Sequence, residues 1–391
     1  MRAALLRFEL RRERWILPIW MLGLLGLLAA SGAAVAREFG DEQERFALAA
    51  IAASNPAFLF LRGLPDGSGV GALVFFQTFS FLAVLAGLMN TFLVVRHTRS
   101  DEERGRTELL AATPIPRTAG LRTTLVIAAG ANILVAAGST GIGLALGFEG
   151  MESLVLGLAI GSVGIAFAGL AALVAQVMPS PRGANGVAAA LVGIAYLVRG
   201  IGDALGTATD PTHVEPSWIS RLSPIGWAQA SAPFSDANPL PLLAVVGLGV
   251  VSAGVALVIR SHRDLGSSLV PERAGRPGWA RASATRLAVR QQRGTTIGWA
   301  VGTIILGTFA GTLAPLVAEA VGSNDQLAEF IGRLAPGLSA DTSQLFTIAL
   351  LGLAGTLATA SSAAFDGSTV VRAGTLRVTS SGALSGGSIE L

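Results

Sequence analysis

The sequence predicts an all-α polytopic membrane protein, and three observations support this fold class. Hydrophobic residues occupy 51% of the 391 positions and charged residues only 14%, so the chain is too apolar for a soluble domain. Several apolar stretches exceed about 18 residues without a charge, the length that a helix needs to cross a hydrocarbon core. The 49 glycines would allow close helix approach in lipid. We expect about eight transmembrane helices, a six-helix unit followed by the first two helices of a second tandem unit.

The first transmembrane unit is expected to occupy residues 1–260. Its opening segment, residues 1–14, interleaves five arginines with leucines and a phenylalanine, the pattern of a helix that lies in the membrane interface. Apolar stretches of spanning length follow, separated by polar or proline-rich segments. They predict six spans, at about 15–36, 71–95, 121–147, 153–178, 184–205 and 239–259.

The rest of the chain is expected to contain three parts. These are a cytoplasmic basic linker with an interfacial helix at 261–293, the start of a second transmembrane unit at 294–366, and a Gly/Ser-rich, disordered tail at 367–391. The second unit would supply a seventh and an eighth span, at about 295–317 and 344–365.

An internal similarity supports a tandem arrangement. Residues 7–23 align without gaps on residues 286–302, with five identities in 17 positions, and both stretches are basic lead-ins to a span. Because six spans return the chain to the side on which it began, the similarity indicates a parallel repeat.

The distribution of arginine predicts the orientation in the membrane. All 28 basic residues are arginines. With the N-terminus in the cytoplasm and eight alternating spans, 22 of them fall on the cytoplasmic side and 6 on the outer side. An excess of basic residues in cytoplasmic loops sets membrane topology. We therefore expect a cytoplasmic N-terminus, with the charged segment Arg96–Arg122 on the same side.

This segment between the second and third spans is the most informative stretch of the chain. Ser100 and Glu103 have the spacing of a capping box, so they predict a short amphipathic helix at about 100–113 that Pro114 ends. Acidic residues in its first turn suit the helix dipole. The alternative interpretation is a solvated loop that only obeys the positive-inside rule.

The segment resembles the loop between the second and third spans of ABC-2 type permeases, the membrane subunits of ATP-driven exporters. Two other stretches resemble the same family, Asn55-Pro56-Ala57 and the run from Ser223 to Trp227, the latter being similar to its polyketide-antibiotic and multidrug exporter branch. The loop positions that carry the resemblance are Arg99, Glu102, Glu103, Gly105, Thr107, Glu108, Leu109, Leu110, Thr113, Pro114 and Arg117.

The resemblance implies a partner and a location. In that family the loop is a coupling helix that docks into a separate ATPase subunit, expected as a dimer, which binds ATP and Mg²⁺; this chain itself would hold no cofactor. It also implies the bacterial cytoplasmic (inner) membrane as the location. The residues expected to dock are Glu102, Glu103, Arg104, Glu108 and Arg117.

The C-terminal end departs from the pattern of the family. A complete repeat would place a second coupling helix near residues 377–396, but the chain reads RVTSSGALSGGSIEL and ends at Leu391. We expect either that the chain lacks its C-terminal part relative to the family or that its second half has degenerated, and the sequence favours the first of these.

Missing residue types argue against an enzyme. Without lysine the chain cannot form a standard phosphate-binding P-loop, so a separate polypeptide would hydrolyse ATP. Without cysteine it has no thiolate ligand or nucleophile. The three histidines, His97, His213 and His262, lie far apart and are interpreted as loop or interface residues. We predict no catalytic residue, no metal site and no nucleic-acid partner.

Polar residues inside the predicted spans bear on the transport mechanism. No acid lies near a span midplane, which counts against an ion-gradient-driven carrier. Arg199 and Asp203, four apart, are expected to pair with each other. Other polar side chains are interpreted first as helix–helix hydrogen bonds and alternatively as a pathway lining. The candidate substrate path comprises Phe76, Gln77, Phe79 and Asn90 in the second span.

The function implied is ATP-powered export of a hydrophobic small molecule of the antibiotic or drug class. The expected partners are an ABC ATPase, the lipid bilayer and that substrate. Two alternatives remain open at this stage, an ion-gradient-driven secondary transporter and a truncated membrane protein that does not transport.

Overall fold

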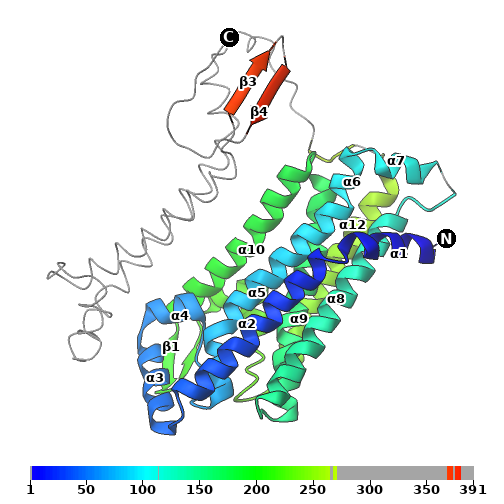
Figure 1. Cartoon of the computed structure of the whole chain (residues 1–391). Coiled ribbons are helices and arrows are strands. Elements are labelled where there is room, and N and C mark those ends of the chain that lie inside the picture. Colours follow the sequence, from blue (N-terminus) through cyan, green and yellow to red (C-terminus); the bar gives the residue numbers. More distant parts are fainter. Residues whose placement is uncertain (1, 113, 265–266, 271–367, 373–374, 380–391) are drawn as a thin grey trace. The chain divides into compact units, whose positions relative to one another are not determined.

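The computed structural model describes residues 2–112, 114–264, 267–270, 368–372 and 375–379 (Figure 1). The chain divides into two compact units, Met1–Ala274 and Gly275–Leu391. In the described part of the first unit, six helices are long and apolar enough to cross a membrane, which confirms the all-α polytopic class. They are α2 (Ile16–Glu38), α5 (Val70–His97), α8 (Ala119–Ala145), α9 (Gly150–Val177), α10 (Pro181–Ala204) and α12 (Leu240–His262). The seventh and eighth predicted spans lie outside the described residues.

Helices α5 and α9 form the centre of the bundle. About 72% of their spanning windows is buried, against 22–33% for the other four spans. Helix α9 packs against α5, α8, α10 and α12. At its crossing with α12, Gly169 meets Gly249 so closely that a Cβ on Gly169 would lie 2.1 Å from the Gly249 carbonyl oxygen. Glycine thus permits the close backbone approach that its abundance predicts.

Three helices begin with the same capping motif, a Ser or Asn followed by Pro. Asn55, Ser180 and Ser223 each accept a backbone N–H with the side-chain oxygen. Proline then occupies the first helical position, where no intrahelical N–H is needed. The helices that start in this way are α4 (Pro56–Arg62), α10 and α11 (Pro224–Gln229).

One end of the bundle, here called the distal end, carries short elements in place of long loops. The segment between α2 and α5 contains helices α3 (Glu42–Ser54) and α4. Strands β1 (Thr207–Asp210) and β2 (His213–Glu215) form an antiparallel hairpin, followed by the 3-10 helix η1 (Trp218–Leu222) and α11.

A buried ion pair fixes α4 to the distal end of α10. Arg199 and Asp203 are fully buried, and Nη1 of Arg199 lies 3.1 Å from Oδ2 of Asp203, which confirms their predicted pairing. Arg199 also donates to the backbone carbonyls of Leu59 and Phe60 in α4. Ser220 and Gln229 donate to the Asp203 carboxylate. Both charges are therefore neutralised and hydrogen-bonded, as a buried pair requires.

The other end, here called the N-terminal end, carries α1 (Arg2–Glu13), α6 (Arg99–Glu103) and α7 (Arg106–Ala111). The predicted single helix at 100–113 is wrong, because Gly105, with φ +69°, separates α6 from α7. The predicted capping box is wrong too. Thr98 takes the N-cap position, and no side chain caps the first turn. Asp101 and Glu102 bond to arginines instead of backbone amides.

In the second unit, the strands β3 (Ser368–Arg372) and β4 (Thr375–Thr379) pair antiparallel, with Ser368 opposite Thr379. The expectation of disorder throughout the tail is therefore wrong for these ten residues. The β-branched residues Thr369, Val370, Val371 and Val378 favour strands. The glycines and serines around them are typical of a disordered tail, and the prediction followed that composition.

Candidate functional site: a charged docking face and a membrane groove

Glu102 lies at the centre of a buried charge cluster at the N-terminal end. Its carboxylate accepts from Nη1 of Arg99 at 2.6 Å, from Nη2 of Arg263 at 2.6 and 2.7 Å, and from Arg260. The four side chains are 4–7% exposed. Arg99 also donates to the Pro179 carbonyl. This set, named the Glu102 cluster, connects α6 to the end of α12 and to the segment after α9.

A second set of ion pairs connects α6 and α5 to the N-terminal helix. Arg12 of α1 contacts Asp101 at 2.6 Å. Glu13 accepts from Arg96 at 2.9 Å and lies 2.7 Å from Nε2 of His97. Burial alone would raise the pKa of Glu13, but the His97 hydrogen bond and the Arg96 charge lower it below its ordinary value. Glu13 is thus held as a carboxylate.

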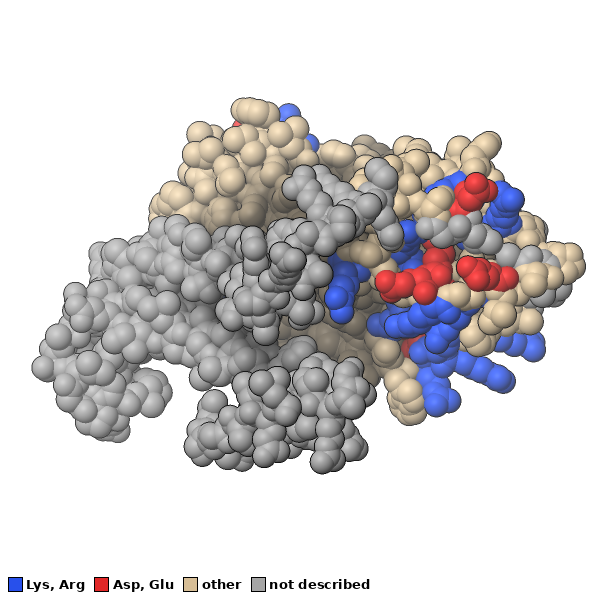
Figure 2. Space-filling model, turned by 90° about the horizontal axis from the view of Figure 1, so that it is seen from above, with Lys and Arg blue, Asp and Glu red and all other residues tan. Residues whose placement is uncertain are grey.

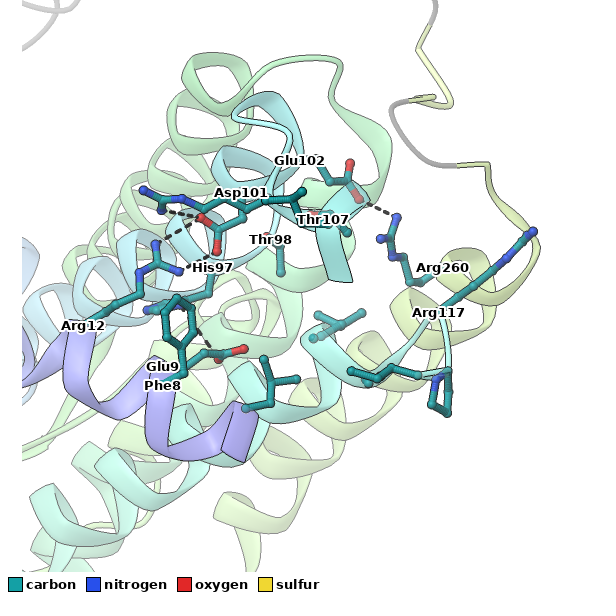
Figure 3. Close-up of a pocket in the computed structure, with 18 of the residues that line it drawn as sticks. Phe8, Glu9, Arg12, His97, Thr98, Asp101, Glu102, Thr107, Arg117 and Arg260 are labelled. Carbon is teal, nitrogen blue, oxygen red and sulfur yellow. Dashed lines mark hydrogen bonds and ion pairs between the residues drawn. The ribbon is translucent and has the colours of Figure 1, made fainter. Parts of the chain in front are cut away.

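Between these sets lies a cavity of about 570 Å³ (Figure 3). Glu9, Arg12 and His97 line one side, and Glu102, Arg117 and Arg260 line the other. Figure 2 looks onto this end and shows acidic and basic side chains gathered in one mixed patch. The volume is within the range of small-molecule sites, and the lining combines charges of both signs with apolar side chains such as Leu5, Phe8 and Ile115. Charges of both signs also suit a protein–protein contact that matches opposite charges.

Four of the five predicted docking residues are exposed on the outside of this region. Glu103, Arg104 and Glu108 are exposed, and Arg117 has a side chain that is 62% exposed. Glu102 differs, since its side chain is 7% exposed and forms ion pairs with three arginines. Within the chain Glu102 therefore has an internal role, and its contact with a partner stays a prediction. The docking face, as used below, consists of Glu103, Arg104, Glu108, Arg117 and the apolar Leu109, which is 75% exposed.

Most of the predicted substrate path is part of the packed core. Phe76 and Phe79 are 3% and 1% exposed. Asn90 is fully buried and pairs reciprocally with Asn132 of α8, at 3.0 and 2.8 Å, which confirms the helix–helix interpretation for both amides. These residues fill the space between helices because α5 is buried on almost every side. Of the four, only Gln77 lines an open site, a groove of about 820 Å³.

The chain matches a family model described as the C-terminal domain of the multidrug efflux system permease Rv1217c, over residues 4–259 and 282–368. It belongs to this family. It is also 33% identical over 372 residues to the multidrug efflux system permease protein Rv1217c of Mycobacterium tuberculosis (strain ATCC 25618 / H37Rv). That alignment covers 94% of this chain and 65% of the relative, so the chain spans less than two thirds of the relative's length. It is a multi-pass membrane protein, since it belongs to this family and its described part contains six helices that are long and apolar enough to cross a membrane.

The role of the acids in the N-terminal helix could not be predicted from the sequence. Glu9 and Glu13 are 4% and 2% exposed, and His97, predicted as a loop or interface residue, is buried between them at 5%. Burial raises the pKa of Glu9 to about 7, against a hydrogen bond from Thr124 that lowers it. The available signal was the spacing of the two acids, four apart on one helix face among arginines.

Proposed function

We propose that the chain is the membrane subunit of an ABC-2 type exporter, which moves hydrophobic small molecules of the drug class out of the cytoplasm. A separate ATPase subunit, as a dimer, would bind ATP and Mg²⁺ and supply the energy. The observation that carries the proposal is the docking face: exposed charges of both signs around an exposed leucine. This face extends from α6, whose inner side is held by the Glu102 cluster, across α7 to Arg117. Mixed charges around an apolar anchor suit a specific protein partner.

The buried contacts favour rigid-body transmission from this face to the spans. Helix α6 follows α5 after a single residue, Thr98, whose hydroxyl donates to the Val94 carbonyl at 2.6 Å. Glu102 ties α6 to α12, and Asp101 ties it to α1. A partner that displaces α6 would therefore displace the ends of three helices together. This coupling requires no rearrangement inside the bundle, because the moving parts are already bonded to one another.

The orientation and the tandem arrangement remain part of the proposal. The 22 to 6 split of arginines supports a cytoplasmic docking face and N-terminus in the bacterial inner membrane. The internal similarity between residues 7–23 and 286–302 supports a second unit that begins within the basic linker.

The test begins with an affinity purification of the tagged full chain from its own host. A P-loop ATPase that co-purifies would identify the partner, and the complex would then be reconstituted with charge-reversed chains. In Glu103→Arg we expect ATP hydrolysis to continue while efflux of Nile red is lost. The control is Glu44→Arg, an exposed acid of α3 at the distal end, in which both activities should persist. Wild-type efflux by Glu103→Arg would overturn the docking assignment, and efflux driven by a proton gradient without ATP would overturn the class of transporter.

A further inference from the structure

The groove at the distal half of the bundle contains a cation that has no partner in the described part of the chain. The groove lies between α2, α5 and α10, with Arg62 of α4 at one end. No described residue accepts a hydrogen bond from the Arg62 guanidinium or forms an ion pair with it. Burial lowers the pKa of the Arg62 guanidinium. By contrast, Arg199 at the same end bonds to a carboxylate and three backbone carbonyls.

The rest of the groove is apolar, with a few polar groups at one depth. Leu27, Phe81 and Leu85 supply apolar surface. The side chains of Gln77 and Ser31 also line it, and neither hydrogen-bonds to another described residue. Gln77 lies seven residues from the start of α5 and Ser31 seven residues from the end of α2, so both are about 10 Å inside the spanning region.

We propose that this groove, the Arg62 groove, binds an amphipathic organic acid as the exported solute, with its anionic group on Arg62 and its apolar body along α2 and α5. A guanidinium presents a planar fork of donors that matches a carboxylate or sulfonate. The volume of about 820 Å³ is within the range for drug-sized ligands. The assignment rests on the proposed export function and names the chemical class of its substrate.

The depth of the groove favours a solute over a membrane lipid. The Arg62 carbonyl accepts a hydrogen bond from Ser80, ten residues inside α5, so the backbone of Arg62 is no shallower than Gln77. Acyl chains of a lipid in the groove would leave Gln77 and Ser31 facing hydrocarbon without a partner, which is unfavourable. A solute that carries a further polar atom besides its acid group can satisfy these side chains together with Arg62.

Binding can be measured without the ATPase, so its failure is distinguishable from failure of the transport assignment. The full chain would be placed in phosphatidylcholine nanodiscs, with empty nanodiscs as background. Two fluorescent probes share one aromatic body: 1-anilinonaphthalene-8-sulfonate carries an anion, and N-phenyl-1-naphthylamine does not. We expect Arg62→Gln to weaken sulfonate binding at least about tenfold, the effect of losing one hydrogen bond to a charged group. Binding of the neutral probe should change less than about twofold.

Two further variants separate charge at the groove from charge in general. Arg62→Lys should retain most of the sulfonate binding. Arg37→Gln removes an exposed arginine at the distal end of α2, outside the groove, and should leave both probes unaffected. Equal sulfonate binding by wild type and Arg62→Gln would overturn the proposal. Sulfonate binding by wild type no higher than that of empty nanodiscs would also overturn it, because the groove would then be closed to solutes. Displacement of the sulfonate by phosphatidylglycerol in wild type but not in Arg62→Gln would assign the groove to lipid and overturn the solute.

Discussion

Glu102 is the residue whose replacement tests the N-terminal end most directly. Substitution by Gln keeps the size of the side chain and removes its charge. Three arginines, 4–7% exposed, would then remain buried without their carboxylate. An uncompensated buried charge is among the most destabilising consequences of a single substitution.

The size of the effect follows from what each arginine retains. Arg99 would still donate to the Pro179 carbonyl, and Arg263 to the carbonyls of Gln176 and Ser267. The guanidinium of Arg260 donates to the carboxylate of Glu102, so it would lose this bond to a charged partner. Breaking a buried pair costs about 3–5 kcal/mol. Because two of the three arginines keep carbonyl partners, we expect the lower end, about 3 kcal/mol of unfolding free energy.

The assay is an SDS titration of the purified chain in mixed micelles, with helicity followed by circular dichroism. The matched control is Glu103→Gln, the exposed neighbour on the same helix, which should change the unfolding free energy by less than about 0.5 kcal/mol. A second variant, Glu102→Gln with Arg260→Met, removes the stranded cation and should be more stable than Glu102→Gln alone. If Glu102→Gln and Glu103→Gln unfold at the same SDS fraction, the buried cluster does not exist as described.

Two further predictions concern packing and pH. Gly169→Leu should destabilise the bundle by about 1–3 kcal/mol, because its side chain would overlap the backbone of α12 at Gly249. The control in the same SDS titration is Gly186→Leu, since the space around the Cβ position of Gly186 is open. Equal unfolding midpoints of the two variants would refute the close crossing of α9 and α12. The folded chain holds the Glu9 proton up to about pH 7, whereas the unfolded chain releases it near the ordinary pKa of 4.5. The contribution of Glu9 to the free energy of unfolding therefore falls as the pH rises from about 4.5 to about 7, by up to about 1.4 kcal/mol per pH unit. In urea titrations, Glu9→Gln should lack this decrease of stability with pH. The same decrease in Glu9→Gln and wild type would contradict the raised pKa.

The spans could be predicted because their signal is local and strong. Each of the first six predicted ranges overlaps one observed helix, with ends that differ by a few residues. Apolar length alone identifies a spanning helix, since the bilayer forbids unpaired backbone groups. The pairing of Arg199 with Asp203 could also be predicted, because both partners lie on one helix face four residues apart.

The candidate site was less predictable because its contacts join residues far apart in the sequence. Glu102 meets Arg260 and Arg263, about 160 positions away. Spacing identified Glu102 as one of several acids on a short helix but could not show which acid faces inward. The break at Gly105 had a local signal, a glycine between two arginines, which the apparent capping box outweighed.

The amide pair between α5 and α8 determines how these two spans can move. Asn90 and Asn132 each donate to and accept from the other, so axial sliding of one helix along the other breaks both bonds at once. The pair therefore resists sliding between these two spans, which are also connected along the chain by the segment that contains α6 and α7. A displacement of that segment thus acts on two helices that are joined both through their connecting segment and by hydrogen bonds inside the bundle.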